Sequence, residues 1–189
     1  TGHLVSLDTD ITDKTEGWVK TLTARMGEPL IRTAVMQAMR IMGGQYVLGR
    51  TIQEGLKQGI KLNGVNTRFS FDMLGEGART DADALGYYRA YSDAIDEIGA
   101  ATPKTLVDVK ITDGISVKLS ALHCRYYFSH HQSVLEELLP RIKQLCLQAK
   151  SYNIGLSIDA EEAYRLEISL DIFEALACDP DLDDWQGLG

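Results

Sequence analysis

The sequence predicts an α/β fold in which parallel strands alternate with helices. Short apolar runs are separated by long stretches with helical periodicity. The runs are 68–74, 114–119 and 154–160, and the helical stretches are 81–98, 132–152 and 161–177. Connections of helix length favour parallel βαβ units over hairpins. A further observation is that every run contains a serine followed two residues later by a charge.

The segment before the first run is predicted to be helical. Residues 16–58 are predicted to be helical, and an apolar stripe recurs at three- and four-residue intervals from Ile31 to Met42. A polar stretch from Gly59 to Asn66 is typical of a linker. We therefore expect a helical segment at 1–66 and the βα units at 67–189.

Helix starts are predicted from capping residues. Thr80 and Asp81 lie at the start of the first long helical stretch, and Asp159 lies just before the last. Short polar side chains at these positions accept hydrogen bonds from the backbone N–H groups of a helix N-terminus. The like positions Asp72, Lys118 and Asp159 are 46 and 41 residues apart, so a fourth strand is expected to centre near residues 195–200 and to start at Gly187-Leu188-Gly189. We expect the chain to hold about three of the eight units of a full barrel.

The three apolar runs share one pattern of alternating faces. Side chains alternate across a strand, so each run divides into an apolar face and a polar face. The polar faces hold Ser70 and Asp72; Ser116, Lys118 and Ser120; and Ser157 and Asp159. One interpretation is a sheet with a solvated face. The other is a parallel barrel with serines in one inner layer and charges in the next, and the helix-length connections favour it.

The barrel interpretation gives Lys118 a favourable environment. An unpaired ammonium is costly to bury, but Asp72 and Asp159 would lie beside it on the neighbouring strands. Glu76, four residues after Asp72, would lie above the same mouth. One ammonium among several carboxylates suits a zwitterionic substrate. A purely structural ion-pair cluster is the alternative.

The composition of the chain limits the kinds of partner, metal site and cellular compartment that are expected for it. The formal net charge is −8 and the basic residues are scattered, so this segment is not expected to contact nucleic acid.

The three cysteines make neither a zinc pattern nor a disulfide framework, which favours a reducing cytoplasm. No metal site is expected, because His130 and His131 lack a third ligand at suitable spacing. No apolar run reaches the about 18 residues of a membrane-spanning helix. Homo-oligomerisation is left open.

Four collinear motifs resemble one family. They are MGEPLIRTAVMQAMRIMGGQYVLGRTI (26–52), FSFDMLGE (69–76), GISVKLSALHCRY (114–126) and IGLSIDAEEAYRLEISLD (154–171). Together they resemble the helical segment and the proline dehydrogenase domain of the bacterial bifunctional flavoprotein family proline utilization A. The resemblance covers nearly the whole chain, from about residue 25 to residue 189.

The resemblance implies an FAD-containing, distorted (β/α)8 TIM-like barrel that oxidises L-proline to Δ1-pyrroline-5-carboxylate. Hydride would pass from proline C5 to the flavin, and electrons would then pass to a membrane quinone as acceptor. The implied location is the bacterial cytoplasm, with peripheral contact to the inner membrane left open. The family's main flavin-binding strands, and a helix with paired arginines, would lie beyond Gly189.

The resemblance also implies roles for individual residues. Lys118 matches a lysine that pairs with the substrate carboxylate, and Asp159 matches an aspartate near flavin and substrate. Glu76 matches a carboxylate that pairs with a substrate-clamping arginine, and Asp72 matches a supporting acid. Ala160 would lie at the strand end beside the flavin, so Asp159 and Ala160 are the expected cofactor contacts.

Two positions depart from the family pattern. Cys124 stands where the family has proline, which is expected to loosen the loop after the second strand. Tyr164 replaces an acidic residue and is expected on the outer surface.

Two other functions remain open from the sequence. One is a barrel lyase or aldolase in which Lys118 forms a Schiff base. The other is a folding or interaction fragment with no activity of its own.

Overall fold

The computed structural model describes residues 29, 31–44, 46–63, 67–105 and 108–189. The chain divides into two compact units, Thr1–Val47 and Leu48–Gly189. In the first unit, residues 31–44 form a helix, as the apolar stripe predicts. Its apolar side chains are exposed within the described residues, Ile31 to 64% and Met42 to 63%. The helical prediction for 16–28 lies outside the described residues.

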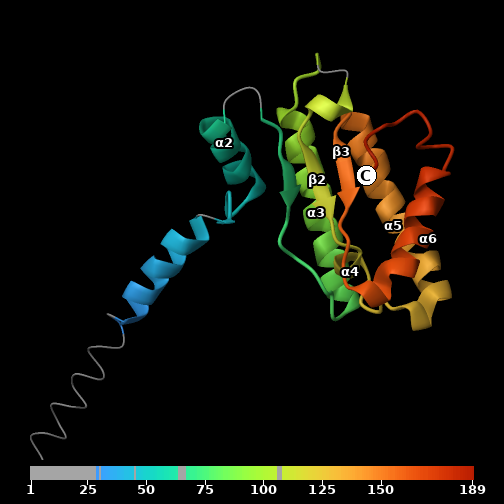
Figure 1. The fold of residues 1–189 in the computed structure, drawn as a ribbon, viewed down its shortest axis with the longest axis horizontal. Helices are drawn as coiled ribbons and strands as arrows, with labels where there is room; N and C mark the ends of the chain where they lie inside the picture. The colour runs from blue at the N-terminus through green and yellow to red at the C-terminus, as the bar shows by residue number, and fades with distance from the viewer. Residues whose placement is uncertain (1–28, 30, 45, 64–66, 106–107) are drawn as a thin grey trace, which may run out of the picture. The chain divides into compact units, whose positions relative to one another are not determined.

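The second unit is built on a parallel sheet of three strands, β1 (Ser70–Asp72), β2 (Gly114–Val117) and β3 (Gly155–Ile158). The sheet order is β1-β2-β3, and both neighbouring pairs are parallel. In Figure 1 the three arrows accordingly run in the same direction. The prediction of parallel βαβ units is therefore confirmed for these strands.

Helices connect and follow the strands. The long helices are α3 (Asp81–Ala101), α5 (His131–Tyr152) and α6 (Leu166–Ala177). Shorter elements are α4 (Leu119–Leu122) and the 3₁₀ turns η2 (Val109–Ile111), η3 (Phe128–His130) and η4 (Ala163–Arg165). α3 packs on α5 and α5 packs on α6, so each connection lies beside the next. This succession is the one expected of consecutive βα units.

The two faces of the sheet differ as the alternation predicts. Ile115, Val117 and Leu156 are completely buried in the apolar core that the helices cover. Ser116 and Ser157, on the other face, are only half-buried. The serine face therefore lies opposite the helix-covered face, on the side that would be the interior of a barrel.

A fourth chain segment pairs with β3. Leu188 forms a parallel bridge with Leu156. The Leu156 N–H donates to the Gly187 carbonyl at 2.8 Å, and the Ile158 N–H donates to the Gly189 carbonyl at 2.8 Å. The expectation that a strand begins at 187–189 is confirmed, because these are the slanted bonds of a parallel ladder.

The helix α2 (Ile52–Asn63) corrects one prediction. Gly59 is not in a linker but inside α2, where a Cβ would lie only 2.9 Å from the Phe69 ring. Gly55 likewise lies against Phe71, so the two glycines let α2 approach the β1 segment. A linker between the helical segment and the βα units would fall at 64–66, outside the described residues. The boundary after residue 66 stays a prediction.

Of the predicted helix caps, Thr80 is confirmed and Asp159 is wrong. Thr80 caps α3 in a reciprocal capping box with Asp83, as predicted. Asp159 is not a helix cap, because α6 begins at Leu166 and the Asp159 carboxylate bonds to Lys118 instead. Ser120 is not on the polar strand face, because the chain leaves β2 at Val117 and enters α4.

Candidate functional site

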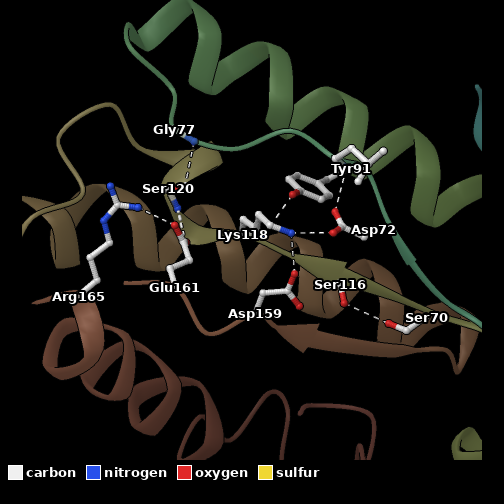
Figure 2. A network of polar contacts seen from close by, with 11 residues as sticks. Ser70, Asp72, Gly77, Tyr91, Ser116, Lys118, Ser120, Asp159, Glu161 and Arg165 are labelled. Carbon is white, nitrogen blue, oxygen red and sulfur yellow. Dashed lines mark hydrogen bonds and ion pairs between the residues drawn. The ribbon is translucent and has the colours of Figure 1, made fainter. Parts of the chain in front are cut away.

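Lys118 lies between two carboxylates at the carboxyl ends of neighbouring strands. Its Nζ is 2.7 Å from Asp72 Oδ2 and 2.8 Å from Asp159 Oδ2. The Lys118 side chain is 17% exposed, so one side of the cluster remains open to solvent. Figure 2 shows the three side chains converging from β1, β2 and the end of β3. The sequence prediction that these residues meet is confirmed.

The local backbone holds both carboxylates in place. The N–H of Leu74 donates to Asp72 Oδ1 at 2.8 Å, and Leu74 itself has a left-handed φ of 53°. This turn folds the chain back over the Asp72 carboxylate. The N–H of Asp159 donates to the Val117 carbonyl at 3.0 Å, which extends the β2–β3 ladder up to the site.

Side chains of β1 contact residues two positions beyond their register partners in the β2 segment. Ser70 is in register with Gly114, yet its Oγ lies 3.2 Å from the Oγ of Ser116. Asp72 is in register with Ser116 and reaches Lys118, two residues further on, in the same way. Side-chain layers that run obliquely to strand register are expected where strands tilt, as in a barrel.

The charge state of the cluster follows from these contacts. Burial alone would lower the pKa of Lys118, but hydrogen bonds to Asp159 and Asp72 raise that pKa above its ordinary value. Burial would raise the pKa of Asp72, but the bonds from Lys118 and Leu74 hold it below the usual range. The ammonium is therefore present at neutral pH. A Schiff-base lysine needs a neutral amine, so the pairing disfavours the lyase alternative.

Lys118 retains one donor for a ligand. An ammonium has three N–H groups, and the described residues accept two of them. The partly exposed side chain leaves the third able to meet an anion from the open side. The site can thus bind a carboxylate while offering negative charge to a nearby amine.

Tyr91 of α3 supports the Lys118 backbone. Its hydroxyl accepts the Lys118 N–H at 3.2 Å, and Tyr91 is 1% exposed. Burial raises the pKa of the Tyr91 phenol, which keeps it neutral. Sequence reasoning missed this contact, since helical spacing alone marks Tyr91 only as a packing residue.

Glu76 and Ala160 take no part in the side-chain contacts of this cluster. Both are exposed, and Glu76 forms no ion pair with the residues that the structure describes. The roles that the resemblance implies for them stay predictions.

The two departures from the family pattern have defined surroundings. The half-buried Cys124 thiol donates to Asp81 Oδ1 at 3.1 Å, and this bond raises the pKa of the thiol. Tyr164 is 57% exposed, as expected, and stacks on Tyr127 with the ring centroids 6.3 Å apart.

His123 serves a structural role in the loop after α4. It is 4% exposed, its Nδ1 accepts the Arg125 N–H at 3.1 Å, and its Nε2 is 3.3 Å from Glu137 Oε2. Over the described ranges, no group of three or more His, Cys, Asp and Glu side chains could hold a metal ion. In the same ranges no helix has both the length and the apolarity to cross a membrane.

The Asp72–Lys118 pair predicts a pH-dependent contribution to stability. Because the pKa of Asp72 is lowered on folding, its ionised form stabilises the fold above the unfolded-chain value of about 3.9. This contribution is lost as the pH falls through the lowered folded value. We expect Asp72→Asn to reduce the free energy of unfolding at pH 7 by up to about 1 kcal/mol, since Asp72 is partly exposed. Urea unfolding should show the deficit shrinking below about pH 4. A deficit that is constant with pH would contradict this origin.

Two protein-family models match this chain. A protein-family model described as "Proline dehydrogenase" matches residues 55–189. A second, described as "DNA-binding domain of Proline dehydrogenase", matches residues 1–46. This second match runs against the expectation of no nucleic-acid contact, but only for that stretch.

Curated relatives and solved structures are similar over most of the chain. The bifunctional protein PutA of Klebsiella aerogenes is 50% identical over 168 residues, covering 89% of this chain and 13% of the relative. That of Rhizobium meliloti is 48% identical over 189 residues, covering all of this chain and 15% of the relative. A mutant of Bradyrhizobium japonicum proline utilization A is 47% identical with a TM-score of 0.69, covering 89% of this chain and 17% of that one.

A more distant structure shares the fold. Proline utilization A of Bdellovibrio bacteriovorus is 17% identical with a TM-score of 0.75, covering 85% of this chain and 18% of that chain. The chain thus spans only 13% to 15% of the curated relatives that it matches.

Proposed function

Since this chain belongs to the proline dehydrogenase family, we propose that it forms part of an FAD-dependent enzyme oxidising L-proline to Δ1-pyrroline-5-carboxylate in proline catabolism. The observation that carries the proposal is Lys118, held between Asp72 and Asp159 at the carboxyl ends of parallel strands. Barrel enzymes place their chemistry at this end of their strands.

Substrate binding is assigned to the charged cluster. The third N–H of Lys118 would donate to the proline carboxylate in a charge-assisted hydrogen bond. Asp72 and Asp159 would keep Lys118 protonated and oriented while the substrate exchanges. Asp159 would also lie near the substrate amine. Glu76 would pair with an arginine that clamps the substrate.

The end of β3 fits one part of a flavin site. Ala160 is exposed and carries only a Cβ, so a flat ring system can lie against the backbone beside Asp159. FAD, when bound, would accept the hydride from C5 of proline. Asp159 and Ala160 are the residues proposed to contact it, while Lys118 would hold the substrate in a fixed orientation.

The wider architecture is part of the same proposal. Residues 67–189 would form the first three units of a (β/α)8 barrel, with 1–66 as a preceding helical segment. Residues 1–46 would belong to a DNA-binding module, as suggested by the description of the matching family model. Membrane quinone would accept the electrons, at the inner face of the bacterial cytoplasmic membrane.

The flavin content of the protein and the reduction of that flavin by L-proline test this function. We expect the full-length protein carrying this sequence to be purified with a flavin absorption band, which L-proline bleaches without oxygen. D-Proline serves as the control and should bleach it much more slowly, since its carboxylate projects from the opposite face of the ring. A protein without flavin, or a flavin that L-proline leaves oxidised, would overturn the proposal. The 189-residue chain alone should show little or no turnover.

A further inference from the structure

Ser120 joins the loops that follow all three strands. Its hydroxyl accepts the Gly77 N–H at 3.1 Å, and its carbonyl accepts the Ala78 N–H at 2.8 Å. Its own N–H donates to Glu161 Oε1 at 2.9 Å. Ser120 is 2% exposed, so these bonds are shielded from water. Gly77 and Ala78 follow β1, and Glu161 follows β3, so one residue connects the three loops (Figure 2).

Glu161 is fully engaged on both carboxylate oxygens. While Oε1 accepts the Ser120 N–H, Oε2 lies 2.6 Å from Nη1 of Arg165. The side chains of Glu161 and Arg165 are only 10% and 11% exposed.

Aromatic rings fix Arg165 in turn. The guanidinium carbon lies 5.3 to 5.5 Å from the ring centroids of three tyrosines, Tyr126, Tyr127 and Tyr164. Cation–π contacts at this distance hold a guanidinium in place when it is partly desolvated. Arg165 therefore presents a fixed partner to Glu161, and Glu161 presents a fixed acceptor to Ser120.

The Ser120–Glu161 bond is the neighbour of the Lys118–Asp159 ion pair. Ser120 follows Lys118 by two residues, and Glu161 follows Asp159 by two residues. The two contacts join the same two chain segments, one through the substrate-facing charges and one through buried groups. Lys118 stands at the N-cap of α4 but makes no side-chain cap, because an ammonium has no acceptor to offer the N–H groups of a first helical turn. Glu161 supplies the missing acceptor for that first turn.

We propose that Glu161, acting through Ser120, is a positioning residue that sets the spacing of Lys118 and Asp159 for the substrate. The proposal rests on the function proposed above and adds a residue to that site. Glu161 does not touch the substrate; it locks the loop after β2 to the loop after β3. Loss of the Ser120–Glu161 hydrogen bond should displace Lys118. Small displacements of a binding group lower catalytic efficiency, kcat/KM, by up to about 100-fold.

Neighbouring glutamates give a matched pair of variants. Glu162 pairs with the same Arg165 at 3.1 Å, but it is 56% exposed and has no bond to Ser120. In the full-length flavoprotein, we expect Glu161→Ala to raise the KM for L-proline about 10- to 100-fold, with a smaller change in kcat. Glu162→Ala should change KM by less than about threefold. Equal effects of the two substitutions would overturn the proposal.

Conservative variants separate positioning from folding. Glu161→Gln keeps an oxygen acceptor for the Ser120 N–H and should recover most of the affinity for proline. Glu161→Asp keeps the charge but is shorter by one methylene, so it should raise KM by about tenfold. If Glu161→Ala does not fold, the Asp variant still decides, and an unchanged KM would contradict the proposal.

Hydrogen exchange provides a readout that does not depend on turnover. The Ser120 amide should exchange faster in Glu161→Ala than in Glu162→Ala, because only the first loses the acceptor of that N–H. Faster exchange with an unchanged KM would refute the link to the substrate site. If the unsubstituted protein did not turn over proline, the proposed function would be refuted. The exchange result would still test the hydrogen bond between Ser120 and Glu161.

Discussion

Lys118→Ala in the full-length protein is expected to raise the KM for L-proline by about 100-fold. The substitution removes a hydrogen bond to a charged group, worth about 1.5–3 kcal/mol. It also leaves Asp72 and Asp159 without their cation, so their charge repels the substrate carboxylate. Steady-state kinetics with proline would measure the change, with flavin content recorded to show that the protein is loaded.

Lys110→Ala is the matched control for Lys118→Ala. Lys110 lies before β2 in η2 and is exposed, so its loss should leave the KM unchanged within about threefold. A Lys118 variant with the KM of the unsubstituted protein would remove Lys118 from the substrate site.

The second large effect is expected at the start of β2. A Cβ at Gly114 would lie 2.7 Å from the carbonyl oxygen of Gly155, a backbone atom in the paired strand that cannot rotate away. Gly114→Ala should therefore push β2 and β3 apart and lower the free energy of unfolding by about 1–3 kcal/mol.

Gly155→Ala is the control, because the nearest atom to its Cβ would be the Gly187 carbonyl oxygen, at an ordinary contact distance of 3.6 Å. Urea unfolding of the two variants should show a clear deficit for Gly114→Ala and a much smaller one for Gly155→Ala. Equal stability would mean that the strands adjust to a methyl group at either position.

Part of the site follows from the sequence because strand alternation is a local property. Once 114–119 is taken as a strand, Ser116 and Lys118 must share a face. The matching pattern on the other two strands then places Asp72 and Asp159 beside Lys118. Which residues share a face depends only on the two-residue period of the strand and not on distant contacts. The prediction therefore holds even where the predicted strand ends are wrong.

The hydrogen bond between Ser120 and Glu161 could not be predicted from the sequence, because tertiary contacts bring these two residues together. The strand pattern continued to Ser120, but the chain turns into α4 after Lys118, where Glu161 supplies the N–H acceptor. Asp159 had the composition of a helix start, which is a weak local preference, but its carboxylate forms an ion pair with Lys118 instead. Gly59 was similarly misassigned, since only the Phe69 ring explains a glycine inside α2.

Lys118 is central to the proposed function as the group that binds the substrate carboxylate. Cyclopentanecarboxylate, which has the ring and the acid but no amine, tests that role directly as a competitive inhibitor of proline oxidation. Its inhibition constant should rise in Lys118→Ala by about the same factor as the KM for L-proline, near 100-fold. An inhibition constant that is the same in the variant and in the unsubstituted protein would contradict the carboxylate role of Lys118.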